Sequence, residues 1–159
     1  MILVTGGAGF IGSNFILDWL QCSEEPIINL DKLTYAGNSE NLSSLNGDNR
    51  YIFIKGDIGD VTLVTQLLKQ YEPRAVLNFA AESHVDRSIH GPEDFVQTNV
   101  VGVLRLLQSV RSYWLELNYE ARTAFRFLQI STDEVYGSLS ETDPAFSESN
   151  RIEPNSPYS

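Results

Sequence analysis

The sequence has 159 residues, of which 42% are hydrophobic, and a formal net charge of −10 at pH 7. This length and this hydrophobic content are typical of one folded domain with a substantial core, and they exclude an intrinsically disordered chain. The excess of carboxylates opposes binding to nucleic acids or anionic membranes, whose phosphates attract Lys and Arg, but it is compatible with one nucleotide held by backbone amides.

Short apolar runs alternate along the chain with stretches of helical periodicity. They predict buried strands at residues 1–5, 27–30, 51–54, 75–80 and 125–130, and helices at residues 10–21, 61–70 and 93–117. Strands that alternate with helices form parallel sheets through right-handed crossovers, and helices then cover both faces of the sheet. The sequence therefore predicts an α/β fold, a Rossmann-like doubly wound parallel sheet.

Ligands of such a sheet bind beyond the carboxyl ends of the strands, so the segments that follow the strands are the candidates for function. The first strand is followed by TGGAGFIG, which contains the Gly-x-Gly-x-x-Gly pattern and also a wider Gly-x-x-Gly-x-x-Gly spacing. Glycines permit a tight turn and close approach to a pyrophosphate, and the next helix directs free N–H groups at the phosphates. The predicted phosphate-binding residues are Gly6, Gly7, Gly9, Phe10, Ile11 and Gly12.

The second and third predicted strands are followed by aspartates. Asp31 stands about 20 residues beyond the last glycine, where an acid hydrogen-bonds the ribose of NAD and repels the 2′-phosphate of NADP. Asp57 and Ile58 stand where the adenine ring is expected. The structural alternatives are a turn or helix cap for Asp31, and a cap of the next helix for Asp57 or Asp60. The predicted contacts of the adenosine part are Asp31, Lys32, Leu33, Thr34, Asp57 and Ile58.

The fourth predicted strand is followed by AAESHVDRSI. Ala80 and Ala81 are small enough to let the backbone approach the cofactor. His84 is predicted either to contact the substrate or to be a structural hydrogen-bond partner. Thr98 and Asn99 lie in the long predicted helix, where they form either a satisfied buried contact or a brace for the ends of the fourth and fifth strands.

The fifth predicted strand is followed by STDEVYG, which places a hydroxyl and two carboxylates, from Thr132, Asp133 and Glu134, where the strand leaves the core. A turn would explain them, because Asp and Thr are common in turns.

The sequence resembles the extended short-chain dehydrogenase/reductase family over its whole length. Within that family it is most similar to the nucleotide-sugar 4,6-dehydratases. The resemblance rests, in order, on TGGAGFIG, NLDKLTYAGN, GDI, AAESHVDRSI, STDEVYG and PNSPYS. The glycine motif is common to the family, whereas DKLTYAGN, AAESHVDRSI and above all STDEVYG are far more specific. Related 4-epimerases generally lack the Asp-Glu pair after the threonine.

The resemblance implies NAD-dependent dehydration of dTDP-glucose to the 4-keto-6-deoxy sugar. Tyr158, as tyrosinate, would take the proton of the 4-hydroxyl, and Thr132 would hydrogen-bond the 4-oxygen. Glu134 would remove the proton on carbon 5, and Asp133 would protonate the departing 6-hydroxyl. The implied catalytic residues are therefore Thr132, Asp133, Glu134 and Tyr158, the implied substrate contacts are Ser83, His84 and Thr132, and the further implied cofactor contacts are Ala80, Ala81, Ser83 and Thr98.

The resemblance also implies a domain assignment, in which residues 1–159 form the NAD-binding domain. The lysine of the family's Tyr-x-x-x-Lys motif would fall at position 162, after Ser159, and the smaller C-terminal substrate domain has no counterpart in this sequence. We therefore expect little or no turnover by the 159 residues alone, and activity of a full-length parent as a homodimer formed through the long helix. The alternatives are a nucleotide-sugar 4-epimerase, a dehydratase of another nucleotide sugar, and a non-catalytic NAD-binding module.

Cysteine content and hydropathy bear on the cellular compartment. Cys22 is the only cysteine, so no internal disulfide can form and a zinc cluster is not expected. No apolar run reaches the ~20 residues that span a bilayer, and glycines interrupt the apolar N-terminus before a signal peptide is complete. The sequence thus predicts a cytoplasmic protein that binds no metal.

Overall fold

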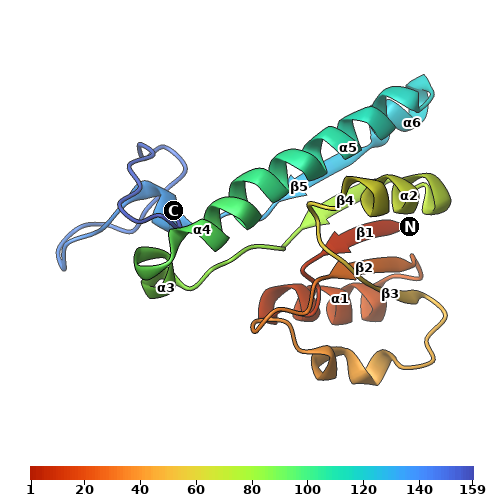
Figure 1. Ribbon diagram of the computed structural model, residues 1–159, viewed down its shortest axis with the longest axis horizontal. Helices are drawn as coiled ribbons and strands as arrows, with labels where there is room; N and C mark the ends of the chain where they lie inside the picture. Colours follow the sequence, from red (N-terminus) through yellow and green to blue (C-terminus); the bar gives the residue numbers. More distant parts are fainter.

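The computed structural model describes all of residues 1–159 and contains one parallel sheet of five strands (Figure 1). The strands are β1 (Ile2–Thr5), β2 (Ile27–Asp31), β3 (Tyr51–Lys55), β4 (Ala75–Asn78) and β5 (Arg126–Gln129). Their order in the sheet is β3-β2-β1-β4-β5, and every neighbouring pair is parallel. The order reverses between β1 and β4, which creates the switch point where doubly wound sheets bind ligands. The predicted Rossmann-like fold is confirmed.

Helical segments connect the strands. They are α1 (Phe10–Cys22), η1 (Ser39–Leu45), α2 (Val61–Tyr71), α3 (Val85–His90), α4 (Pro92–Phe95), η2 (Val96–Gly102), α5 (Val103–Glu116), α6 (Tyr119–Ala124) and η3 (Asp133–Tyr136). The three predicted helices are present within a few residues, but the long one contains a π-helical stretch, η2, between α4 and α5. The sequence did not predict the short segments η1, α3, α6 and η3.

Two apolar clusters hold the helices against the sheet. On one face, residues of α2 and α5 such as Val64 and Leu106 pack with Leu3 and Val76 of the strands. On the other face, α1 and η1 pack their buried side chains, among them Ile16, against β1 and β2. Figure 1 shows α5 and α1 on opposite sides of the sheet. Both faces of the central strands are thus covered, which leaves the carboxyl ends of the strands as the place for a ligand.

The prediction of buried strands was wrong for the two edge strands, β3 and β5. No residue of β3 is fully buried, and Phe53 is 38% exposed. Arg126 and Gln129 are exposed, and the Leu128 side chain is 50% exposed. β5 is an edge strand, and only its α5 side packs into a core, through Phe127. The cluster on the α1 side contains residues of β1, β2 and β4 but none of β5, so Leu128 has no helix over it. An apolar run predicts that a segment forms a strand, but the positions of the neighbouring helices decide whether that strand is buried.

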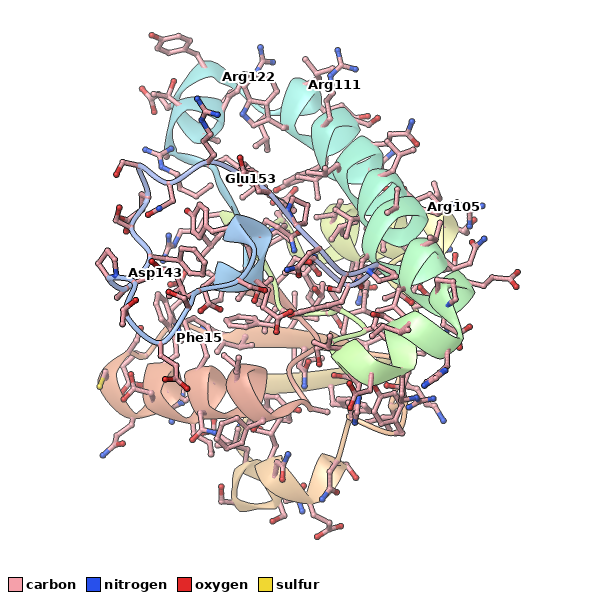
Figure 2. All side chains as sticks on the ribbon, turned by 90° about the vertical axis from the view of Figure 1, so that its left-hand side faces the viewer. Phe15, Arg105, Arg111, Arg122, Asp143 and Glu153 are labelled. Carbon is pink, nitrogen blue, oxygen red and sulfur yellow. The ribbon has the colours of Figure 1, made fainter.

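Residues 137–159 contain no helix or strand. Figure 2 shows Asp143 and Glu153 on this segment. The Glu153 N–H donates to the Val135 carbonyl at 2.9 Å, and the Tyr158 ring meets the edge of Phe95 with 6.5 Å between ring centroids. These contacts return the end of the chain to α4. None of the helices is both long and apolar enough to cross a membrane.

An ion pair between Glu25 and Arg74 joins the segments that precede β2 and β4, and it predicts a pH effect on stability. Arg74 Nε and Nη2 donate to the two Glu25 carboxylate oxygens at 2.7 and 2.6 Å, and these bonds hold the pKa of Glu25 below its ordinary value. A carboxyl with a lowered pKa stabilises the fold above its unfolded-state pKa, and this contribution disappears as the pH falls through the folded-state pKa. We expect Glu25→Gln to cost about 1 kcal/mol or less at pH 7.

Denaturant unfolding of the parent and of Glu25→Gln at neutral pH and at about pH 2 checks this prediction, because Glu25 is protonated in both states at the lower pH. The difference in unfolding free energy should vanish there. A difference of the same size at both pH values would contradict a charge effect and indicate lost packing.

Candidate functional site

A cavity of about 520 Å³ lies at the carboxyl ends of the strands, and residues that follow each of the five strands contribute to its wall. Among the residues predicted from the sequence, the wall includes Gly6, Gly9, Phe10, Ile11, Gly12, Asp31, Lys32, Thr34, Asp57, Ile58, Ala80, Ala81, Ser83, Thr98, Thr132 and Tyr158. The fold therefore brings segments that are far apart in the sequence to one site. The predicted residues outside the wall are Gly7, Leu33, His84, Asp133 and Glu134.

The glycine turn between β1 and α1 forms one part of the wall. Gly6 has φ of +72°, a backbone conformation that side chains disfavour. Its carbonyl accepts from the Gly9 N–H at 3.2 Å, which closes the turn. Phe10 and Ile11, at the N-terminus of α1, are 80% and 62% exposed, so the first turn of the helix faces open space. A 13-residue helix that starts here presents its free N–H groups at the cavity, as phosphate binding requires.

Two buried side chains of β2 fix the glycine turn from behind. Asn29 Oδ1 accepts from the Gly7 N–H at 3.1 Å, and Asp31 Oδ2 accepts from the Ala8 N–H at 2.8 Å. Gly7 is thus a structural member of the turn and lies behind the wall. The second Asp31 oxygen accepts from the Leu33 N–H at 2.7 Å. The sequence analysis did not identify Asn29. The signal was an amide within the apolar run IINL, since a buried amide needs hydrogen-bond partners.

The third strand contributes an ion pair and a helix cap. Asp57 Oδ2 lies 2.8 Å from Lys32 Nζ, and Asp57 Oδ1 accepts from the Gly59 N–H at 2.7 Å. Burial alone would raise the pKa of Asp57, but the bonds from Lys32 and Gly59 outweigh it and hold that pKa below its ordinary value. The hydrogen bond to Asp57 raises the pKa of Lys32 in turn. Asp60 caps α2 by accepting from the Leu63 N–H at 3.0 Å.

A row of polar side chains crosses the sheet below the cavity. Thr5 Oγ1 donates to Asn78 Oδ1, and Asn78 Nδ2 donates to Gln129 Oε1 at 2.7 Å. Gln129 Nε2 then donates to the Ile130 carbonyl at 3.0 Å. Thr5 precedes the glycine turn and Ile130 precedes the segment that contains Thr132, so this row connects the two ends of the site. The sequence analysis did not identify Asn78, and the amide within AVLNFA was the available signal.

Asn99 resolves the alternatives that the sequence left for the polar pair in the long helix. Its Nδ2 donates to the Glu82 carbonyl at 2.8 Å, and its Oδ1 accepts from the Glu82 N–H at 2.9 Å. Asn99 therefore braces the segment after β4. It lies in the π-helical stretch η2, and such stretches are common at functional sites. Thr98, its neighbour, lines the cavity.

The segment between β2 and η1 contacts α3 through Tyr35 and Arg87. The Arg87 guanidinium lies 4.0 Å from the centroid of the Tyr35 ring, a cation–π distance. Burial raises the pKa of the Tyr35 hydroxyl, and the neighbouring Glu82 carboxylate raises it further. His84, which precedes α3, is exposed and outside the cavity wall.

The fifth strand leads into η3, where the candidate catalytic residues lie. Thr132 Oγ1 accepts from the Glu134 N–H at 3.2 Å and so caps η3. Thr132 and Tyr158 both line the cavity, whereas Asp133 is exposed and Glu134 is half-buried, both outside its wall. The cavity thus has a turn suited to phosphates near its middle, aspartates at one end and two hydroxyls at the other. A dinucleotide would fit this order with its reactive ring toward the hydroxyls.

Known proteins are similar to this chain in sequence and in fold. Residues 3–159 match the family described as GDP-mannose 4,6 dehydratase. The dTDP-glucose 4,6-dehydratase of Xanthomonas campestris pv. campestris (strain B100) is 61% identical over 157 residues, which are 99% of this chain and 44% of that protein. This chain spans about half the length of the curated relatives that it matches.

Solved structures agree with that comparison. A dTDP-glucose 4,6-dehydratase from Streptomyces venezuelae, crystallised with NAD, is 44% identical with a TM-score of 0.86, over 99% of this chain and 46% of that one. A UDP-glucose 4-epimerase from Thermus thermophilus, also in complex with NAD, is 31% identical with a TM-score of 0.80, over 99% and 45% of the two chains.

Proposed function

The chain belongs to the GDP-mannose 4,6 dehydratase family, whose model matches residues 3–159, and we propose that the whole protein is an NAD-dependent lyase that dehydrates dTDP-glucose to its 4-keto-6-deoxy product. The observation that carries the proposal is one cavity whose wall includes both the glycine turn and the hydroxyls of Thr132 and Tyr158. The Asp-Glu pair after Thr132 favours a dehydratase over an epimerase, because the elimination of water needs a base at carbon 5 and an acid at carbon 6, and inversion of carbon 4 needs neither. In this proposal residues 1–159 hold the cofactor.

The residues of the wall fit NAD. The N-terminus of α1 would bind its pyrophosphate, Asp31 would bind the adenosine ribose, and Asp57 with Ile58 would lie at the adenine. When bound there, NAD would supply hydride-transfer chemistry, with the hydride taken from carbon 4 of the sugar and returned to carbon 6, so that the reaction would consume no cofactor.

Four side chains of the chain would handle the protons. Tyr158, ionised, takes the proton of the 4-hydroxyl during oxidation, and the Thr132 hydroxyl donates to the 4-oxygen. The resulting ketone acidifies the proton on carbon 5, which Glu134 removes. Asp133, protonated, donates to the 6-hydroxyl as it leaves as water. Ser83 and His84 are the further candidate contacts of the sugar.

The sugar would lie between the reactive end of the cofactor and η3, outside the dinucleotide cavity. This placement accounts for Asp133 and Glu134, which lie on η3 directly after Thr132 but do not line the cavity. It requires only that the substrate bridge from the cavity to η3.

Incubation of the whole protein with NAD and dTDP-glucose tests the proposal. We expect loss of one water from the sugar by mass spectrometry, and transfer of deuterium from carbon 4 to carbon 6 in a labelled substrate. A product of unchanged mass with inverted carbon 4 would establish an epimerase instead. NAD binding without any product from dTDP-glucose or from other nucleotide sugars would indicate a non-catalytic module.

We further propose that the protein forms a homodimer through the long helix. Val96, Val100, Leu104 and Leu107 form an exposed apolar stripe along η2 and α5, while the opposite side of α5 packs on the sheet. The spacing of four, four and three residues keeps the stripe on one helix face. Exposed apolar stripes of this kind mark interaction surfaces.

Leu104→Asp is expected to convert the dimer into a monomer, because the substitution places a charge at the centre of the stripe. Light scattering coupled to size-exclusion chromatography of the whole protein measures the mass. Ser112→Asp adds the same charge at an exposed position of α5 outside the stripe and should leave the dimer intact. A monomeric parent, or a Leu104→Asp variant that stays dimeric, would contradict the proposed interface.

A further inference from the structure

Acidic side chains outnumber basic ones on the cavity wall. The wall contains three carboxylates, from Asp31, Asp57 and Glu82, and only one cationic side chain, that of Lys32. A dinucleotide with a 2′-phosphate carries extra negative charge at its adenosine ribose. Enzymes that bind such a cofactor use a basic side chain near the end of the second strand. Lys32 stands at that position, directly after Asp31, so the sequence contains a residue of the type that would attract NADP.

Asp57 engages this one cation. Its Oδ2 lies 2.8 Å from Lys32 Nζ, and its other oxygen accepts from the Gly59 N–H at 2.7 Å. The backbone bond fixes the carboxylate at the end of β3, and the ion pair draws the ammonium toward it. Arg105, which projects from α5 in Figure 2, donates to the Gly59 carbonyl at 3.5 Å and does not line the cavity. No second cation on the wall can replace Lys32.

Asp31 cannot move aside for a phosphate. Its side chain is buried, and its two oxygens accept from the N–H groups of Ala8 and Leu33. Rotation of this carboxylate would leave both backbone donors without a partner, which is costly in a buried site. The end of β2 thus presents a fixed negative charge beside a lysine whose own charge is paired.

We propose that Asp57 is a specificity-determining residue, which directs the site to NAD by holding the Lys32 ammonium away from the position of a 2′-phosphate. This inference rests on the proposed function, since it concerns the same cofactor site. The two aspartates contribute differently to this preference. Asp31 repels the 2′-phosphate, whereas Asp57 pairs with the Lys32 ammonium, the one cationic group on the wall that could attract it. The alternative is that Asp57 contacts only the adenine, in which case its loss would change the affinities for NAD and NADP by the same factor.

Calorimetric titration of the cofactor-free whole protein with NAD and with NADP tests the inference. Asp57→Asn keeps an oxygen that can accept from the Gly59 N–H but removes the charge that holds Lys32. We expect the ratio of its NADP affinity to its NAD affinity to rise by about threefold to tenfold, as suits a partly exposed charge pair. The gain should shrink as salt is added, because salt screens the Lys32–phosphate attraction.

Two further variants identify the cause. Asp57→Asn combined with Lys32→Met should lose the gain in NADP affinity, since the freed ammonium is its source. Asp60→Asn is the matched control, because it removes one carboxylate from the same loop while its cap on α2 can persist. It should leave the NADP-to-NAD ratio unchanged.

The outcomes distinguish this inference from the proposed function. NAD binding by the parent with an unchanged ratio in Asp57→Asn overturns the role of Asp57 alone. A gain that survives Lys32→Met, or that Asp60→Asn reproduces, also overturns it, because net charge would then be the cause. Binding of neither dinucleotide by the parent overturns both the inference and the proposed NAD site.

Discussion

Replacement of Gly6 by alanine is expected to destabilise the domain by about 2–5 kcal/mol and to abolish NAD binding. Gly6 has φ of +72°, where a side chain is strained, and an added Cβ would lie 2.6 Å from the Ala80 Cα and in contact with the Ala80 nitrogen. These atoms belong to the backbone after β4, which cannot rotate away as a side chain can. The turn would have to shift, and with it the N–H groups that face the phosphates.

Two other glycines separate the causes of that loss. Gly47 also has a positive φ, of +90°, but nothing lies within 4 Å of an added Cβ, so Gly47→Ala tests backbone strain alone and should cost about 1–2 kcal/mol without affecting NAD. At Gly9 the nearest atom to an added Cβ is the Gly6 carbonyl oxygen, at 3.3 Å. Gly9→Ala should therefore fold with nearly the parent stability and yet bind NAD about tenfold more weakly or worse, because its methyl group projects from the cavity wall.

Chemical denaturation followed by circular dichroism measures the stability of the three variants, and calorimetry measures their NAD affinity. A Gly6→Ala variant with the stability of the parent would show that the strands can separate at this point. Parent-like NAD affinity in Gly9→Ala would place the pyrophosphate elsewhere and would remove the physical basis of the cofactor site.

The sequence predicted the parts of the site that depend on local geometry. A glycine turn, an acid after the second strand and a helix that starts at the cavity are set by residues close together in the chain, so the sequence alone identified TGGAGFIG and Asp31. Asn29, Asn78 and Asn99 were not assigned their roles, because their partners lie on other strands or connecting segments. The sequence contained a warning in each case, since an amide within an apolar run must find a partner once it is buried.

The incorrect prediction that β5 is buried has a different origin. The run FRFLQI has the composition of an internal strand, but composition cannot tell which faces of a strand the helices will cover. Leu128 is half-exposed because the apolar cluster around α1 includes no residue of β5. The π-helical turns of η2 were also unpredictable from hydrophobic periodicity, which gives the length of the helix and not its hydrogen-bond pattern.

Glu134→Gln in the whole protein is expected to lower the rate of dehydration by about 10²- to 10⁴-fold, the usual contribution of a general base. Glutamine has nearly the same shape, and the Glu134 backbone N–H would still donate to Thr132 Oγ1, so η3 should keep its cap. In the proposed mechanism the oxidation of carbon 4 depends on Tyr158 and Thr132, so it should survive. We therefore expect the variant to form reduced cofactor on addition of dTDP-glucose while it no longer exchanges the carbon 5 proton with deuterated solvent.

Asp133→Asn should fail at the next step. Proton removal from carbon 5 would continue, because Glu134 is intact, but the departing hydroxyl would lack its proton donor. The variant should therefore exchange the carbon 5 proton with solvent and still release little 4-keto-6-deoxy product. Glu148→Gln, an exposed acid in the irregular segment after η3, is the control and should react like the parent. If both η3 variants retain full turnover, Asp133 and Glu134 do not act on the substrate. The acids that assist elimination must then come from another part of the protein.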